Sequence, residues 1–359
     1  MTKDTACLIL SITPHFSYKR FLHCISLGVD LVELVKNPSN HIDTLKLKSQ
    51  SIEFLQNKNY SKYLEQTSLW LDRGDKFNII SYFDEKYPAN LKEIATPPIV
   101  LYCLGDVGLL GSTQLAIVGS RKNTSYGENA TRKIVAELVS NNITITSGLA
   151  YGIDTLSHKY TLDNSGKTIA VIGTGIDVVY PAANKSLAHK IAENGLIVSE
   201  FAFGTKPQKH NFPQRNRVIS ALAKGTLVIE AASKSGSLIT AKYALEQNKE
   251  IFAIPGSIFS GASEGCNELI QQGAKLVCNV DDILTELNIS KQTTVIAENK
   301  DSLSDEQQAI YNLLNHENIT TIDQMINTTA FDYTKVNEIL FELEMEDLVK
   351  SKIGGYIKL

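Results

Sequence analysis

The residues that most clearly suggest a binding site are Gly119, Ser120 and Arg121, which end a short apolar run. The run predicts a buried strand, and a helical pattern begins at about Thr124, so Gly119 lets the backbone bend and a hydroxyl caps the helix. Such a turn directs free backbone N–H groups and the positive end of the helix dipole at one place, where anions bind. Arg121 adds a fixed fork of donors that suits phosphate. Taken alone, the stretch also fits an ordinary strand-to-helix turn with an exposed arginine.

Positive charge collects in two windows that lack Asp and Glu. One window covers residues 107–127, with Arg121 and Lys122, and the other covers residues 201–229. The second window holds the basic residues Lys206, Lys209, His210, Arg215, Arg217 and Lys224. Aromatic residues lie among these cations, namely Phe201, Phe203, Phe212 and Tyr126. A single-stranded nucleic acid requires cations along its phosphates and rings against its bases; the alternative is that the rings are core and the cations form a solvated loop.

Three other kinds of site fail on their spacing. Residues 173–175 read Gly-Thr-Gly and lack the third glycine of a dinucleotide fingerprint. Residues 165–168 contain the Gly-Lys-Thr of a P-loop, but the first glycine of that motif would fall at Thr161, and the segment enters a strand. Asp154 and His158, four apart on a predicted helix, lack a third metal ligand, so a structural hydrogen bond or cap is favoured. We therefore expect no cofactor and no metal.

The composition predicts a cytoplasmic protein of more than one domain. With 359 residues the chain exceeds one small core, and 43% hydrophobic and 21% charged residues are ordinary globular values. Five scattered cysteines without a CxxC pair favour buried thiols in a reducing compartment. No segment has the pattern of a signal peptide or of a membrane span. The net charge of −4 gives no general attraction to nucleic acid, so binding would depend on where the charges lie.

The elements that must position these residues form a repeating strand–helix pattern. Strands are expected at residues 77–82, 99–104, 114–118, 143–146, 168–172, 196–199, 226–229, 251–254 and 275–278. Helices are expected between most of them, at residues 124–140, 153–162, 184–193, 215–223, 237–247 and 266–272. This alternation predicts an α/β fold with right-handed crossovers, a parallel sheet, and helices on both faces.

Small and polar residues follow these strands at 119–121, 147–148, 173–175, 200, 230 and 255–257. In a parallel sheet the carboxyl ends of the strands share one edge, which we call the rim. Ligands of such folds bind in a crevice along the rim, so the turns together predict an anion site there.

Five segments occur in an order typical of one protein family. They are IVGSR at 117–121, SGLAYGID at 147–154, FPQRNRVIS at 212–220, SGSLITA at 235–241 and IPGS at 254–257. With these segments the chain resembles DNA-processing protein A, the DprA/Smf family, densely over about residues 80–280. The resemblance implies an extended Rossmann-like domain that binds single-stranded DNA and forms homodimers. It also implies a role in DNA recombination, in which the protein protects incoming single strands and loads the RecA recombinase during natural transformation of competent cells.

The resemblance also implies which residues hold the DNA. The turn at 119–121 should bind backbone phosphates, with Arg121 as the main cation. Lys209 and Phe212 fit the family's Lys-x-x-Phe contact, the lysine on a phosphate and the ring against a base. Residues 235–237, Ser-Gly-Ser, open a helix and should form a further phosphate cradle.

Residues 215–217, Arg-Asn-Arg, are expected on the following turn, where they should support the same groove. The alternative for Arg215 or Arg217 is an internal ion pair, for example with Glu230. The full set of expected DNA-binding residues is Gly119, Ser120, Arg121, Lys122, Thr124, Tyr126, Ser147, Gly148, Lys209, Asn211, Phe212, Arg215, Asn216, Arg217, Ser235, Gly236 and Ser237.

The segments on either side match the family by position and helical pattern. Residues 1–75 predict a small helical, SAM-like domain for packing or a partner, and residues 76–288 form the extended Rossmann-like DNA-binding domain. The polar residues 289–303 predict a linker. Residues 304–359 predict three helices and a hairpin, which resemble the winged-helix domain of some family members.

The third helix of that winged-helix domain is acidic. It holds Glu338, Glu342, Glu344, Glu346 and Asp347 against Lys335. This balance repels a phosphate backbone, so we expect the domain to bind a protein partner and not duplex DNA.

The primary interpretation is a non-enzymatic mediator of recombination, and one enzymatic alternative stays open. A Rossmann-like nucleotide phosphoribohydrolase would use Glu230 as its acid–base residue, but the glycine-rich loop of such enzymes is only partly matched by residues 225–230. Release of free base from nucleoside monophosphates would distinguish the two, because a DNA-binding groove predicts none.

Overall fold

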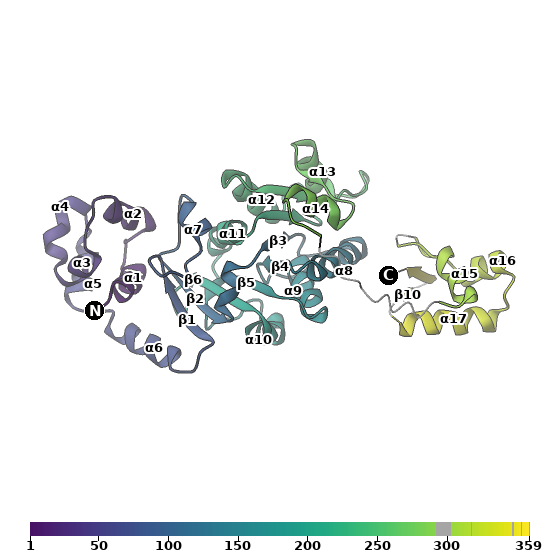
Figure 1. The fold of residues 1–359 in the computed structure, drawn as a ribbon, viewed down its shortest axis with the longest axis horizontal. Coiled ribbons are helices and arrows are strands. Elements are labelled where there is room, and N and C mark those ends of the chain that lie inside the picture. Colours follow the sequence, from purple (N-terminus) through teal and green to yellow (C-terminus); the bar gives the residue numbers. More distant parts are fainter. Residues whose placement is uncertain (292–302, 317, 347, 353, 359) are drawn as a thin grey trace.

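Figure 1 shows the computed structural model of the chain, which describes residues 1–291, 303–316, 318–346, 348–352 and 354–358. Its centre is a nine-stranded sheet in the order β1-β2-β6-β5-β4-β3-β7-β8-β9. The strands are β1 (Phe77–Ser81), β2 (Val100–Gly105), β3 (Gln114–Val118), β4 (Thr144–Ser147), β5 (Thr168–Gly175), β6 (Leu196–Phe201), β7 (Gly225–Val228), β8 (Glu250–Ala253) and β9 (Lys275–Leu276).

The predicted α/β fold with a parallel sheet is confirmed, with one exception. From β6 to β9 along the sheet, every neighbouring pair is parallel, whereas β2 is antiparallel to both β1 and β6. Antiparallel neighbours need no crossover helix over the face of the sheet. The short segment between β1 and β2 accordingly holds only α7 (Ala89–Glu93).

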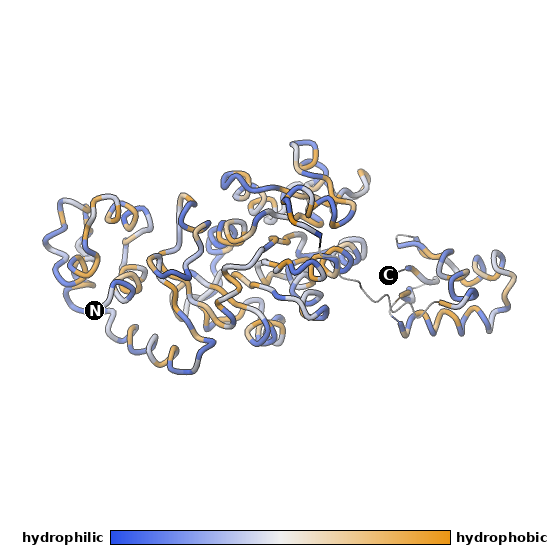
Figure 2. The backbone as a smooth tube through the Cα atoms, in the orientation of Figure 1, coloured by the Kyte–Doolittle hydropathy of each residue, from blue (hydrophilic) through white to orange (hydrophobic). Residues whose placement is uncertain are grey.

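Helices cover both faces of the sheet, as the alternation predicted. One face packs against α7, α11 (Asn211–Leu222), α12 (Ser237–Glu246) and α13 (Glu264–Gln271). The other packs against α8 (Ser125–Ser140), α9 (Ile153–Asp163), α10 (Lys185–Asn194) and α14 (Val280–Glu286). In Figure 2 the central strands are mostly hydrophobic and many of the outer loops are hydrophilic, as burial between two helical layers requires.

The N-terminal segment is helical, as predicted. Its helices are α1 (Lys3–Ile12), α2 (Tyr18–Ser26), α3 (Leu31–Lys36), α4 (Ile42–Leu45), α5 (Ser49–Gln56) and α6 (Ser61–Leu71). They share one hydrophobic cluster with α10 and with one face of β2. The hydroxyls of Tyr63 and Tyr102 lie 2.7 Å apart and join α6 to the sheet. The assignment of this segment as SAM-like stays a prediction.

Phe203 corrects part of the predicted aromatic row. Its ring centre lies 5.3 Å from those of Trp70 and Tyr102 and 5.7 Å from that of Tyr63. The ring therefore packs between α6 and the sheet and does not face a nucleic acid. For this residue the alternative, that the ring is core, is the right one.

The C-terminal segment has the expected order of three helices and a hairpin. Its elements are α15 (Asp305–Leu313), α16 (Ile322–Thr329), α17 (Tyr333–Met345), β10 (Val349–Lys352) and β11 (Gly355–Lys358). Apolar residues of all three helices and of the hairpin form a separate core. Most of the predicted linker, residues 292–302, lies outside the described residues. Within the described ranges, no helix combines the length and the apolar character needed to cross a bilayer.

Two boundaries differ from the prediction in ways that matter for the rim. Residues 173–175, expected as a turn, are the last residues of β5. Helix α11 begins at Asn211, four residues before the predicted start at 215. The sequence pattern missed this first turn because it contains Pro213. Proline is tolerated there, since the N–H groups of a first helical turn have no partner within the helix.

His158, on α9, is a core residue. The Thr168 hydroxyl donates its hydrogen to the Ile145 carbonyl at 2.7 Å, so it accepts a hydrogen bond from His158 Nδ1, also at 2.7 Å. Nε2 is then the unprotonated nitrogen, and it is buried without a hydrogen-bond partner among the described residues. Burial, together with the charge of Arg215, lowers the pKa of His158 from 6.5 to about 3. The structural role favoured for this histidine is thus the one observed.

We expect this histidine to make the fold acid-sensitive. Its pKa is lower in the folded chain than in the unfolded chain, so its contribution is intact above pH 6.5 and is lost as the pH falls toward 3. Between pH 7 and pH 5 the loss should be about 2 kcal/mol of unfolding free energy. Urea titrations at both pH values would show this loss in the wild type and a smaller one in His158→Gln. Equal losses in both proteins would contradict the assignment.

Candidate nucleic-acid interface

The chain reverses its direction across the sheet at β3. From β3 the chain moves outward through β4, β5 and β6, and it then returns to place β7 on the other side of β3. Ligands of α/β sheets bind outside the carboxyl ends of the strands at such a point. The turns after β3 and β7 touch each other here, because the Ser120 N–H donates to the Glu230 carbonyl at 2.7 Å.

A groove of about 760 Å³ lies over these two turns, and we call it the rim groove. Its walls come from the turn after β3 and from the first turns of α11 and α12. The predicted DNA-binding residues that line it are Gly119, Ser120, Arg121, Lys122, Lys209, Phe212, Arg215, Asn216, Ser235, Gly236 and Ser237. The lining also contains residues that were not predicted to bind DNA, namely Val118, Ala150, Asp154, Tyr180, Pro213, Ile219, Ala232, Ile239 and Thr240.

The accessible cations and rings of the groove lie close together. Arg121, Lys122 and Lys209 are exposed. The guanidinium carbon of Arg121 is 5.9 Å from the ring centre of Phe212, and the ring of Tyr180 lies 5.5 Å from that of Phe212, tilted by 40°. Tyr180 follows β5 at the rim, and its place in a loop after a strand was the signal that could have identified it.

Arg215 lines the groove, but its guanidinium donates hydrogen bonds to other residues of the chain. Its guanidinium donates to the carbonyls of Gly148 and Val171, and its Nε donates to Asn216 Oδ1 at 3.1 Å. The Asp154 carboxylate is its electrostatic partner, and burial lowers the pKa of Arg215 to about 10. Arg215 therefore fixes the wall of the groove from within α11. Residues 215–217 lie within α11, as the helix predicted at 215–223 requires.

Asp154 holds the turn after β4. Its carboxylate accepts hydrogen bonds from the N–H groups of Gly148 and Ala150 at 3.1 and 3.4 Å. Burial raises the pKa of Asp154, and the nearby charge of Arg215 opposes that rise. A Cβ atom at position 148 would lie 2.6 Å from the Arg215 guanidinium, so only glycine fits there.

Among the described residues, no group of three His, Cys, Asp or Glu side chains is placed to hold a metal ion.

Arg217 corrects the predicted site most clearly. It is buried and bonded to Glu200, with the two side chains 6% and 9% exposed. Burial raises the pKa of Glu200, and the charge of Arg217 counteracts that rise. The internal ion pair considered for these arginines thus exists, but its acid is Glu200 and not Glu230. Arg217 faces away from the rim groove because it lies on the other side of α11.

Further predicted DNA contacts lie beside the groove and support it. Ser147 is buried and donates to the Ile117 carbonyl at 2.6 Å. Asn211 is buried and its side-chain amide donates to the Gly173 carbonyl at 3.2 Å. The Tyr126 hydroxyl donates to the Pro255 carbonyl at 2.6 Å. Together with Thr124 and Gly148, these residues are outside the groove lining, and their direct contact with DNA stays a prediction.

Lys224 also departs from the charge map. It comes immediately before β7, and its backbone N–H donates to the carbonyl of Gln114, the first residue of β3. The amino ends of parallel strands lie at the edge opposite the rim. This lysine therefore cannot contribute to the groove, although it belongs to the acid-free window.

Glu230 occupies the start of α8. Its carboxylate accepts from the Thr124 N–H at 3.2 Å and from the Thr124 hydroxyl at 2.5 Å. The N-terminus of α8, expected to bind phosphate, is therefore occupied by a protein carboxylate. Glu230 is also the acid–base residue that a nucleotide phosphoribohydrolase would need, and its carboxylate is bound to Thr124.

Comparisons with known proteins agree with this arrangement. The family model described as DNA recombination-mediator protein A matches residues 78–288, and that of the DprA winged helix domain matches residues 297–355. The DNA processing protein DprA of Streptococcus pneumoniae is 48% identical over 211 residues, which are 59% of this chain and 74% of that protein. Protein Smf of Escherichia coli is 37% identical over 345 residues, or 92% of each chain.

Two solved structures are similar as well. The X-ray structure of DprA from Streptococcus pneumoniae superimposes with a TM-score of 0.70 at 38% identity, covering 80% of this chain and 98% of that one. The DprA of Helicobacter pylori, studied for its single-stranded DNA binding mode, gives a TM-score of 0.54 at 32% identity. That match covers 59% of this chain and 96% of the other.

We expect Arg217→Ala to destabilise the chain and Arg121→Ala to leave its stability nearly unchanged. Removal of Arg217 leaves the buried Glu200 carboxylate without its charge partner, which costs about 3–5 kcal/mol. Arg121 is exposed, and such substitutions change stability by about 0.5 kcal/mol or less. Thermal and urea unfolding of both variants would measure the contrast. Similar stability of the two variants would show that the buried pair has no structural role.

Proposed function

Because this chain belongs to the DNA-processing protein A (DprA/Smf) family, we propose that it binds single-stranded DNA in the rim groove and mediates recombination. The observation that carries the proposal is the exposed Arg121 beside the ring of Phe212, 5.9 Å away, at the switch point of the sheet. An accessible cation next to an aromatic face is the minimal unit for holding one nucleotide of a single strand.

Each part of the groove then has its own role. Arg121, Lys122 and Lys209 contact phosphates, because they are exposed and close to the groove. Phe212 and Tyr180 offer ring faces to bases. The helix start at 235–237 supplies the positive end of the α12 dipole and the Gly236 N–H, while the N–H groups of Ser235 and Ser237 donate to the Ala232 carbonyl and to Ser235 Oγ.

The arrangement suits a single strand better than a duplex. Bases in a duplex are stacked on one another and cannot reach the face of Phe212, whereas an unpaired base can. The described acidic residues of α17 add to this preference, because Lys335, the basic residue near its start, is paired with Glu306 at 2.7 Å. The winged-helix segment therefore suits a protein partner.

Family membership supports a finer proposal. We propose that the chain protects incoming single strands and loads the RecA recombinase during natural transformation. It would act as a homodimer in the cytoplasm. We also propose the division into a helical domain at 1–75, a DNA-binding domain at 76–288, a linker at 289–303 and a winged-helix domain at 304–359. No catalytic step is proposed, because the Glu230 carboxylate is engaged at the start of α8.

We expect Arg121→Ala to weaken binding of labelled oligothymidine at least tenfold in a fluorescence anisotropy titration. Three groove cations predict a salt slope of about −2 for the wild type, and loss of one should reduce it by about 0.7. Phe212→Ala should cost about 1–3 kcal/mol of binding and leave the slope unchanged, because stacking releases no counterions.

Lys224→Ala is the matched control, because it removes an exposed cation of the second acid-free window at the opposite edge of the sheet. It should bind like the wild type, and duplex DNA of equal length should bind weakly. Unchanged affinity in both Arg121→Ala and Phe212→Ala would contradict the proposed groove. Release of free base from nucleoside monophosphates would favour the enzyme instead.

The role in loading has a separate test. The chain should accelerate RecA filament formation on single strands covered by a single-strand-binding protein, and Arg121→Ala should lose the effect. The rate can be followed by the ATPase activity of RecA. No acceleration by a chain that binds single strands normally would reject the loading role and leave the DNA-binding proposal standing.

A further inference from the structure

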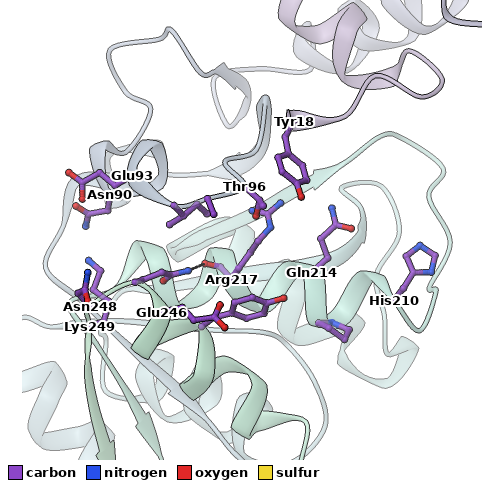
Figure 3. A pocket seen from close by; sticks show the side chains of 15 residues that line it. Tyr18, Asn90, Glu93, Thr96, His210, Gln214, Arg217, Glu246, Asn248 and Lys249 are labelled. Atoms are coloured by element: carbon purple, nitrogen blue, oxygen red, sulfur yellow. Dashed lines mark hydrogen bonds between the residues drawn. The ribbon is translucent and has the colours of Figure 1, made fainter. Parts of the chain in front are cut away.

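A second pocket lies on the other side of α11 from the rim groove. It has a volume of about 540 Å³, and we call it the α11 pocket because Gln214 and Arg217 of that helix line it. Its other lining residues include Tyr18, Thr96, Tyr243 and Gln247. Figure 3 shows Arg217 and Gln214 rising from α11 toward Thr96 and Tyr18. Asn90 and Glu93 face Asn248 and Lys249 at the far end. Nothing in the function described so far uses this pocket.

The charges that line the pocket cancel. Glu93 and Glu246 offset Arg217 and Lys249, and Arg217 is in addition bound to Glu200. Burial lowers the pKa of Lys249, and the nearby charge of Glu93 opposes that fall. A phosphate group needs surplus positive charge, so the pocket does not suit one. Its amide and tyrosine side chains suit a neutral, planar ligand with hydrogen-bonding edges.

Two buried polar atoms of the pocket residues lack a partner among the described residues. They are Nη1 of Arg217, a donor, and Oε1 of Gln247, an acceptor. Both side chains are held in place by their other atoms. Arg217 Nη2 bonds Glu200, and Gln247 Nε2 donates to the Arg217 carbonyl at 3.0 Å. Both atoms are buried, and Glu200 Oε1, also without a partner in the described ranges, belongs to the same ion pair as Arg217. The amides that a carbonyl and an N–H of a ligand would meet are the accessible ones of the lining, those of Asn90, Gln214 and Asn248.

A nucleobase has this chemistry. Its edge carries carbonyl and N–H groups, and its faces pack on tyrosine rings such as those of Tyr18 and Tyr243. The pocket is of the size that holds small organic ligands, so a base with its sugar has room.

The α11 pocket and the rim groove adjoin each other. Pro213 lines both, while Lys209 and Phe212 line the groove and His210 and Gln214 line the pocket. A strand that crosses the first turn of α11 therefore passes from one to the other. We propose that the α11 pocket accepts an unstacked base of the single strand whose phosphates lie in the rim groove. This inference rests on the proposed DNA-binding function.

Two variants of the full chain test the pocket. Ala95 is exposed at its wall, so Ala95→Trp should fill the space without disturbing the core, and Gln214→Ala removes a hydrogen-bonding side chain. Both should bind a twelve-nucleotide oligothymidine about tenfold more weakly. Ala95→Trp should keep the unfolding midpoint of the wild type, whereas Gln214→Ala should lower it slightly, because the Gln214 amide also donates to Glu200 Oε2 at 3.4 Å. Gln208→Ala, an exposed glutamine next to Lys209 that lines neither cavity, is the matched control and should bind normally.

Photocrosslinking locates the base directly. An oligothymidine that contains 4-thiothymidine should crosslink to Tyr18 or Tyr243 in the wild type, and Ala95→Trp should lose these crosslinks while keeping those to Phe212 or Tyr180. Crosslinks confined to the rim groove, with Ala95→Trp binding normally, would overturn the proposal and leave the groove intact. Normal binding by Arg121→Ala and Phe212→Ala, with no crosslink in either cavity, would instead mean that the DNA-binding function itself is wrong.

Discussion

The rim depends on one buried carboxylate. Glu230 follows β7, and its side chain accepts two kinds of hydrogen bond from Thr124 at the start of α8, while its carbonyl accepts from the Ser120 N–H. These contacts clamp the turn after β3, which presents Arg121, against the neighbouring strand. A Cβ atom at position 127 would lie 2.6 Å from Glu230 Oε2, so glycine is required in the first turn of α8. A negative charge is stable at this position because a helix N-terminus favours anions.

Helix α11 carries two buried arginines on opposite faces. Arg215 on one face ties the helix to β5 and to the turn after β4, and Arg217 on the other face is bound to Glu200 at the end of β6. Both arginines are buried, and each is oriented by acceptors that the chain provides. The helix is thereby fixed at both faces, which holds Phe212 in its first turn against Tyr180. A rigid wall of this kind lowers the conformational entropy that the protein itself would lose on binding a strand.

The sequence predicted the sheet, the layered helices and much of the groove, because these follow from local patterns. Alternating strands and helices place small turns at one edge whatever their tertiary contacts, so Gly119, Arg121 and Ser235 could be assigned to one site. The partner of a buried charge cannot be read in this way. Arg217 and Glu200 are 17 residues apart, and only the packing of α11 on β6 brings them together. Tyr180 was missed because its ring meets that of Phe212 only in the folded chain, 32 residues away in the sequence.

The structure changes the electrostatic account of the site more than its location. In the sequence the acid-free windows contain a long row of cations. In the structure Arg215 and Arg217 are bonded to other residues of the chain, and Lys224 lies at the edge of the sheet opposite the rim. Arg121, Lys122 and Lys209 remain as the exposed cations that line the groove. With a net charge of −4, the chain gains no help from a long-range field. In the proposed binding of a single strand, stacking on rings and hydrogen bonds to bases would therefore supply a large share of the affinity, and the residues around Phe212 would matter as much as the arginine beside it.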